Sequence, residues 1–227
     1  MLSRDGYLKK MTERVLRKAT TLKYKDGDEP FIEFPSSNTH ELLVFTDHRQ
    51  VYKCKVAQFE DTKSAQLGSY LPTDLGMDPD ESVTWVIDPE DYKADVLFVF
   101  ENGRVARVAL AGYETKTNRK RLKNAIYGGS KLLFACVLKE DRELALVSSD
   151  QRLINFNTSL LKTKTTNSTQ GVLAFTAKNG RIVTMVGTAE EFLGGTASVE
   201  KFRVASLPSS GSPMKETDMK SLFDLEE

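Results

Sequence analysis

The sequence of 227 residues has little of what catalysis, metal binding or secretion requires. It has only two histidines, and neither His40 nor His48 lies in a pattern of metal-ligand spacing. It also lacks a phosphate-binding loop and a nucleophile beside a base, so the chain alone is predicted to be non-catalytic, with no cofactor and no metal. No run of 18 apolar residues could span a membrane, and no apolar run follows the first six residues as in a signal peptide. Without a secretion signal, Cys54 and Cys136 are expected to be reduced thiols of a cytoplasmic protein.

The formal net charge is zero, but the 32 basic and 32 acidic residues are unevenly distributed. The last twelve residues hold five acids and one lysine, so the rest of the chain has 31 basic and 27 acidic residues and a net charge of +4. We therefore expect a folded domain over residues 1–207 and a flexible acidic tail over 208–227. The tail is either solvated chain or a competitor with phosphate groups for a basic surface.

An internal repeat runs along the chain. Its units share an apolar run, a polar turn of three or four residues and a run that alternates apolar and polar residues; they cover 3–11, 41–56, 95–110, 143–156 and 171–186. Each unit is predicted to form a β-hairpin. Asn102-Gly103 and Asn179-Gly180 are strong hairpin signals, because a type I′ turn needs positive φ at both central residues. Further strands are expected over Ser82–Ile87, Lys131–Leu138 and Ser198–Leu207, whereas Glu114–Ala125 is either a basic loop or a short helix.

The repeat also indicates how the hairpins assemble. A single hairpin cannot bury its own apolar face. Radial repetition of small sheets buries these faces and protects the sheet edges. The sequence therefore predicts an all-β, five-bladed β-propeller-like ring, with one blade for each unit.

Basic residues recur after the alternating strand of the units, where a closed ring would place them at a shared radius. Lysine and arginine on such a surface suffice for sequence-independent affinity for duplex DNA, because binding releases counterions from the phosphates. The candidate DNA-binding residues are Lys9, Lys10, Arg14, Arg17, Lys18, Lys53, Lys55, Lys63, Lys116, Arg119, Lys120, Arg121, Lys123, Lys162 and Lys164. The alternative is a generic β-propeller that serves as a protein-interaction module, with these basic loops on an acidic partner or simply solvated.

Five segments carry a family resemblance in the order expected of successive blades. Asp5–Lys10 (DGYLKK) and Val51–Val56 (VYKCKV) resemble strands of the C-terminal domain of the A-type polypeptide of gyrase. Gly68–Pro72 (GSYLP) with Asp80–Val83 (DESV) resembles the segment between blades in the same family. Gly112–Lys120 (GYETKTNRK) and Thr165–Val172 (TTNSTQGV) are similar to segments of topoisomerase IV A-type subunits. The resemblance covers roughly residues 3–205.

This resemblance implies a β-pinwheel, in which propeller-like blades exchange strands with their neighbours. It implies that the rim binds and bends duplex DNA and presents it to the cleavage core of an ATP-dependent type II topoisomerase, in the nucleoid. The implied partners are double-stranded DNA, the B-type polypeptide that carries the ATPase, and the cleavage domain that lies N-terminal in the A-type polypeptide itself. The family's nucleophilic tyrosine lies outside this segment.

One departure from the gyrase pattern bears on the type of enzyme. Gyrase carries a glycine- and arginine-rich heptapeptide, QRRGGKG, which is tied to wrapping and negative supercoiling. The corresponding stretch here, Thr12–Thr20, keeps Arg14, Arg17 and Lys18 but has no glycine pair. The resemblance therefore favours a topoisomerase IV-like protein over gyrase.

Overall fold

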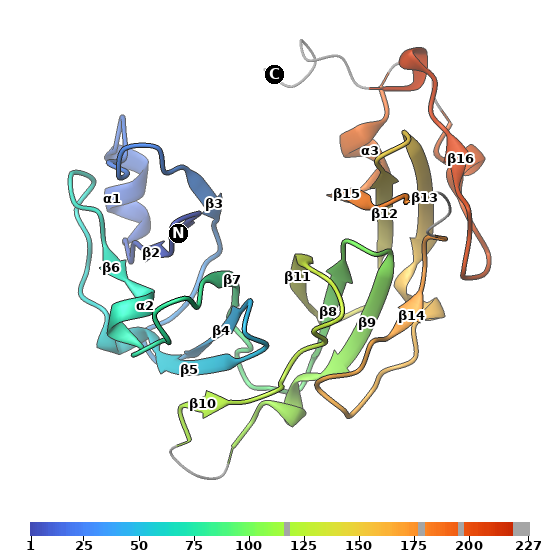
Figure 1. Cartoon of the computed structure of the whole chain (residues 1–227). Coiled ribbons are helices and arrows are strands. Elements are labelled where there is room, and N and C mark those ends of the chain that lie inside the picture. The colour runs from blue at the N-terminus through green and yellow to red at the C-terminus, as the bar shows by residue number, and fades with distance from the viewer. Residues whose placement is uncertain (116–118, 177–179, 195–197, 220–227) are drawn as a thin grey trace. The chain divides into compact units, whose positions relative to one another are not determined.

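The computed structural model describes residues 1–115, 119–176, 180–194 and 198–219, and these form an all-β fold with a few short helices (Figure 1). The chain divides into two compact units. Unit 1 comprises Met1–Tyr92 and Tyr113–Gly128, and unit 2 comprises Lys93–Gly112 and Gly129–Glu227. Each unit holds two four-stranded antiparallel sheets. Helices in the described ranges are all too short or too polar to cross a membrane.

Unit 1 contains sheets with the strand orders β3-β1-β2-β6 and β10-β5-β4-β7. The first sheet consists of β1 (Leu2–Ser3), β2 (Tyr7–Leu8), β3 (Pro30–Ile32) and β6 (Ser69–Tyr70). The second consists of β4 (Glu41–Thr46), β5 (Val51–Lys55), β7 (Val83–Ile87) and β10 (Arg121–Leu122). The connections include α1 (Glu13–Lys18), α2 (Leu71–Asp74) and the 3-10 turn η1 (Val56–Gln58).

Unit 2 contains sheets with the strand orders β11-β8-β9-β14 and β15-β12-β13-β16. The third sheet consists of β8 (Asp95–Phe100), β9 (Arg104–Ala109), β11 (Leu132–Leu138) and β14 (Val172–Leu173). The fourth consists of β12 (Glu143–Ser148), β13 (Arg152–Asn157), β15 (Val183–Gly187) and β16 (Ser212–Pro213). The connections include α3 (Ala189–Phe192) and the 3-10 turns η2 (Leu110–Gly112), η3 (Thr158–Leu160), η4 (Val199–Phe202) and η5 (Glu216–Asp218). Strands β7 and β11 confirm the two strands that the sequence predicts between repeats, over 82–87 and 131–138.

Every sheet receives one short strand from further along the chain. After the hairpin β4–β5, the chain adds β6 to β2 of the first sheet and then returns to pair β7 with β4. The same route recurs when β10 pairs with β5 and β14 pairs with β9. We call the segments that lead into these strands, and into β16, donated segments; they cover 60–70, 114–122, 162–173 and 203–213. Each follows a buried residue: Phe59, Tyr113, Leu161 or Phe202.

The prediction of five blades is wrong, because the residues that the structure describes form four sheets. The central hairpin of each sheet comes from one repeat of the sequence: 3–11, 41–56, 95–110 or 143–156. The repeat over 171–186, in contrast, is divided between two sheets. Its first strand, β14, pairs with β9, whereas its second, β15, pairs with β12. Ala174 and Phe175, which follow β14, are tied to the third sheet, since their backbone N–H groups both donate to the Gly103 carbonyl, at 2.9 and 3.1 Å. The two halves therefore cannot pair with each other.

The four central hairpins share one turn geometry. In each, the last turn residue has a positive φ: 90° at Gly6, 61° at Arg49, 80° at Gly103 and 55° at Gln151. Its N–H donates to the carbonyl three residues earlier, which makes a type I turn closed by a left-handed residue. The type I′ turn expected at Asn102-Gly103 is therefore wrong, because Asn102 is not among the residues with positive φ. The predicted turn at Asn179-Gly180 includes residues outside the described ranges.

A buried hydroxyl closes three of these turns. The side-chain oxygens of Ser3, Thr46 and Ser148 accept from the N–H four residues ahead, at 3.1, 3.3 and 3.1 Å. The third hairpin has Phe100 at this position, and there Asn102 Oδ1 accepts from the Arg104 N–H at 3.2 Å. A small polar residue before the turn thus satisfies a backbone donor that the hairpin ladder leaves free.

The C-terminal segment completes the fourth sheet through β16, which lies beyond the strand predicted to close the ring. The strand predicted over Ser198–Leu207 is wrong; η4 occupies part of this stretch, and its Phe202 belongs to the same buried cluster as Leu153, Ala189 and Met214. Glu114–Ala125, left open as a loop or a helix, contains β10 and no helix among its described residues. Short apolar or basic runs do not reveal which sheet they will join.

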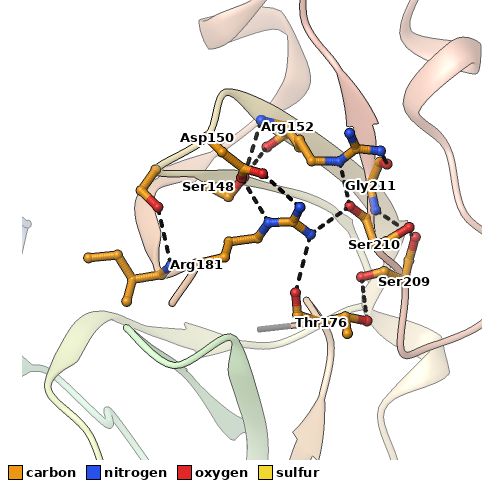
Figure 2. A network of polar contacts seen from close by, with 10 residues as sticks. Ser148, Asp150, Arg152, Thr176, Arg181, Ser209, Ser210 and Gly211 are labelled. Carbon is orange, nitrogen blue, oxygen red and sulfur yellow. Dashed lines mark hydrogen bonds and ion pairs between the residues drawn. The ribbon is translucent and has the colours of Figure 1, made fainter. Parts of the chain in front are cut away.

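Two arginines hold the chain that leads into β16 (Figure 2). Arg152 donates to the carbonyls of Ser210 at 2.8 Å and Gly211 at 2.5 Å. Arg181 donates to the Ser210 carbonyl at 3.1 Å and to both carboxylate oxygens of Asp150, at 2.8 and 2.7 Å. Part of the segment expected as a flexible tail, 208–227, is therefore a strand of the last sheet, and residues 220–227 lie outside the described ranges.

Candidate nucleic-acid interface

A polar cluster, which we call a clamp, recurs at one position of every sheet. It is centred on the fourth residue after the hairpin turn, at the level where the donated segment meets the hairpin. The clamps join Lys10 to Asp61 at 3.1 Å, Lys53 to Glu41 at 3.4 Å, Arg107 to Asp95 at 2.6 Å, and Asn155 to Glu143 at 3.2 Å. In the fourth clamp the cation comes from the donated segment, since Arg203 lies 3.5 Å from Glu143. Each clamp therefore balances one cation with at least one carboxylate inside the protein.

The clamps change the assignment of two candidate lysines. Lys10 and Lys53 have intramolecular carboxylate partners, and their side chains are 18% and 7% exposed. Lys53 also donates to the Thr115 hydroxyl at 3.2 Å. Their carboxylate partners Asp61 and Glu41 are more exposed, at 68% and 34%, but the two lysine side chains themselves are largely covered by the protein. We therefore leave both lysines out of the interface.

Lys9 is buried for a different reason. Its side chain donates to the Gln66 carbonyl, and the residue is 3% exposed. Burial, with a smaller contribution from the charge of Lys23, lowers the pKa of Lys9 below its ordinary value. The ammonium thus ties the first donated segment to its sheet, away from solvent.

Arg121 belongs to a network within the second sheet. Its guanidinium donates to Asp78 and Gln50 and lies 5.3 Å from the centre of the Tyr52 ring. The hydrogen bond from Arg121 is the largest cause that lowers the pKa of Asp78. Beside it, buried Glu81 accepts from the Tyr52 hydroxyl at 2.7 Å. Arg121 therefore attaches β10 to its sheet and is engaged on the protein side.

The same network accounts for the one group that could hold a metal ion in the part of the chain that the structure describes. Ligand atoms of His48, Asp78 and Glu81 lie within 4.8 Å of one another. Arg121 already occupies Asp78, and the Glu81 carboxylate accepts from the hydroxyls of Thr46 and Tyr52. These carboxylates are therefore satisfied by protein donors.

The remaining candidates are exposed cations, and most of them lie in or beside the donated segments. Those without an ion-pair partner among the described residues are Arg14, Lys18, Lys55, Lys63, Arg119, Lys120, Lys123, Lys162 and Lys164. Arg17 pairs with Glu13 at 2.9 Å, but both side chains are at least 80% exposed, so the pair is weak. Lys116 lies outside the described ranges. The first three donated segments thus each bring exposed lysine to a sheet edge: Lys63, Lys120 and Lys164 with its neighbour Lys162.

Sequence reasoning missed Arg203, the cation of the fourth donated segment. It follows buried Phe202 directly, just as Lys162 follows buried Leu161. It also missed the carboxylates of the clamps, although a signal was present. Glu41, Asp95 and Glu143 begin the first strand of their hairpins, and each lies twelve residues before the clamp residue that it meets.

Known proteins resemble this chain in sequence and in fold. No family model matches the chain. It is 27% identical over 125 residues to the A-type polypeptide of DNA topoisomerase 4 from Bacillus subtilis, covering 53% of this chain and 16% of that protein. With the corresponding Staphylococcus epidermidis protein it shares 24% identity over 166 residues, covering 70% and 21%. The chain is homologous to part of the topoisomerase IV A-type polypeptide. It spans 16–21% of the length of these curated topoisomerase relatives.

Solved topoisomerase domains share the fold. The C-terminal domain of DNA topoisomerase IV superposes with a TM-score of 0.74 at 20% identity, covering 96% of this chain and 73% of that chain. The E. coli ParC C-terminal domain gives 0.68 at 14% identity, covering 96% and 93%. The DNA gyrase A C-terminal domain gives 0.63 at 16%, covering 96% and 78%. The predicted relationship to topoisomerase A-type C-terminal domains is confirmed.

Proposed function

We propose that this chain is the duplex DNA-binding domain of an A-type polypeptide of a type II topoisomerase, and that the donated segments carry its interface. The observation that supports this most is the recurrence, in three donated segments, of exposed lysine that has no ion-pair partner in the described part of the chain, which is homologous to a topoisomerase polypeptide. These lysines project from sheet edges, where phosphates can approach them. Contacts of this kind position DNA without reading its sequence.

Affinity in this proposal comes from counterion release, and it must also supply the energy of bending. Curving a site of 20–30 base pairs costs of the order of 1–6 kcal/mol. Several phosphate contacts spread over successive sheets can offset that cost, whereas one cluster could hold only straight DNA. The domain would present the bent segment to a cleavage core, together with a B-type ATPase polypeptide, in a larger cytoplasmic enzyme of the nucleoid.

We further propose that the enzyme is of the topoisomerase IV type. The stretch that corresponds to the gyrase heptapeptide, 12–20, contains the short helix α1, capped by the Thr12 side chain. A helix holds Arg14, Arg17 and Lys18 on a short rigid element, while a glycine pair would give an extended, adaptable loop. The absence of such a loop favours relaxation and decatenation over wrapping.

The test is a titration of unrelated DNA duplexes at several salt concentrations. Lys120→Ala with Lys123→Ala should weaken binding equally for each duplex and lower the slope of log affinity against log salt by up to about 1.8, which is about 0.9 for each phosphate contact removed. Arg121 is left intact because it holds β10 in place.

The matched control removes the same charge elsewhere. Lys25→Ala with Lys201→Ala takes two exposed lysines that pair with Asp5 at 3.3 Å and Asp218 at 2.6 Å. This control should leave the salt slope close to that of the original chain. Equal slopes for all three proteins would contradict the assignment of the second donated segment to the interface.

A further inference from the structure

The third donated segment carries a net positive charge over its whole length. From residue 162 to 173 it reads KTKTTNSTQGVL, which contains two lysines and no acid. Both Lys162 and Lys164 are exposed and have no ion-pair partner among the described residues. The equivalent stretch of the first sheet, in contrast, includes Glu60 and Asp61 beside Lys63.

Backbone pairing holds this stretch extended. The Lys164 N–H donates to the Arg107 carbonyl at 2.8 Å, and the Lys164 carbonyl accepts from the Ala109 N–H at 2.9 Å. Successive side chains of an extended chain point to opposite sides. Leu161 is 3% exposed and the Thr163 hydroxyl bonds to the sheet, so Lys162 and Lys164 share the outward side.

Thr163 fastens the segment through its side chain. Its hydroxyl donates to Asp95 Oδ2 at 2.7 Å, and the same oxygen accepts from Arg107 Nε at 2.6 Å. Arg107 also reaches Asp141 at 2.7 Å. Burial alone would lower the pKa of Arg107, but the hydrogen bonds and charges of Asp95 and Asp141 raise it above its ordinary value. The acceptor for Thr163 is therefore a carboxylate that Arg107 holds in place.

Two of the other clamps use charged residues at this place in the donated segment, whereas in the second sheet the Thr115 hydroxyl accepts from Lys53 at 3.2 Å. Asp61 meets Lys10 in the first sheet, and Arg203 meets Glu143 in the fourth. In the third sheet the inner hairpin already supplies both charges, and the donated segment contributes a neutral hydroxyl. Nothing in this clamp therefore draws the flanking lysines inward.

We propose that Thr163 is a positioning residue for DNA binding. By fixing the segment on Asp95, it keeps Lys162 and Lys164 side by side on one outward face, about 7 Å apart along the extended chain. Two phosphates of one duplex can then be met at once, without the entropy loss of ordering a mobile loop. This inference rests on the proposed function, and its test separates the two.

The experiment measures duplex affinity and its salt slope for four variants of the full chain. Thr163→Val removes the hydroxyl at nearly constant volume and should weaken binding by about three- to tenfold, the range expected from the net loss of one ordinary hydrogen bond. Thr163→Ser keeps the hydroxyl and should restore the original affinity. Thr165→Val makes the same change two residues on, at an exposed threonine, and should have no effect. Lys162→Ala with Lys164→Ala reports whether the lysines bind DNA at all.

The outcomes distinguish the two claims. If the lysine variant weakens binding and Thr163→Val does not, the positioning role is refuted and the interface stands. If the lysine variant binds as tightly as the original chain, the third donated segment is not part of the interface. Both the positioning role of Thr163 and the proposed interface are then refuted for this segment. If Thr163→Ser is as weak as Thr163→Val, or Thr165→Val is equally weak, the effect is not due to the hydroxyl on Asp95. Unfolding curves confirm that all variants are folded at the temperature of the titration.

Discussion

Arg107 offers the sharpest test of the clamps as structural elements. Its guanidinium bridges Asp95 at 2.6 Å and Asp141 at 2.7 Å, and the side chains of Arg107 and Asp95 are only 18% and 16% exposed. Arg107→Met keeps the aliphatic stem but leaves the Asp95 carboxylate without its cationic partner. Removing one partner of a well-buried pair costs about 3–5 kcal/mol. We expect about 2–3 kcal/mol, because Asp141 is 42% exposed and keeps its hydration.

This loss is large enough to measure by thermal unfolding. In a chain of this size each kcal/mol lowers Tm by about 2–4 °C, so Arg107→Met should lower it by roughly 4–12 °C. Arg104→Met is the control, since Arg104 lies on the same strand and its side chain has no ion-pair partner among the described residues. It should change the free energy of unfolding by about 0.5 kcal/mol or less.

A double-mutant cycle then isolates the pair. Asp95→Asn removes the orphaned charge, so Arg107→Met in that background should cost less than it does alone, with a coupling energy of about 1–3 kcal/mol. Additive effects, or a Tm for Arg107→Met equal to that of the control, would refute the view that the Arg107–Asp95 pair of this clamp stabilises the fold.

Two further predictions concern titrating groups. Burial, and secondarily the charge of Glu41, raises the pKa of the Cys54 thiol to about 12; a Cys136→Ser variant at pH 8 should therefore react with a thiol reagent only as fast as it unfolds, and rapid labelling of the native protein would contradict this. The hydrogen bond from Arg181 is the largest cause that lowers the pKa of Asp150, so their contact stabilises the fold above about pH 4 and is lost as pH falls through the lowered value. Arg181→Met should lower Tm at pH 7 but much less at pH 3, and an equal decrease at both would show that the carboxylate is not the partner that matters.

Local patterns in the sequence were sufficient to predict the central hairpins. Alternation and turn residues identify the segments around Arg49, Gly103 and Gln151, because a hairpin is built from neighbours in the chain. The same information predicted a hairpin for the repeat over 171–186, where the two strands pair with other sheets. Its partners, β9 and β12, lie elsewhere in the chain, and a strand of two residues has too few side chains to specify which edge it joins.

Candidate site residues were harder to predict for a related reason. Composition marks where lysine and arginine gather, but it does not tell a cation that meets a carboxylate from one that meets water. Lys53 and Lys120 are neighbours across a sheet edge, since the Lys53 N–H donates to the Lys120 carbonyl at 2.8 Å. One nevertheless pairs with Glu41, while the other is exposed. Side-chain direction on a paired strand decides the difference, and it follows from register.

The donated segments also bear on how the chain can be synthesised and cut. No sheet is complete when its own hairpin leaves the ribosome, because its last strand is made only after the next stretch of chain. The first sheet must wait for Ser69–Tyr70, and the fourth must wait for Ser212–Pro213. The stretch of chain that completes a blade therefore extends beyond the start of the next blade. A truncation placed between two blades removes the donated strand from the blade that precedes the cut. Ending the chain at residue 207 would expose the edge of β13 and leave Arg152 without the carbonyls it binds.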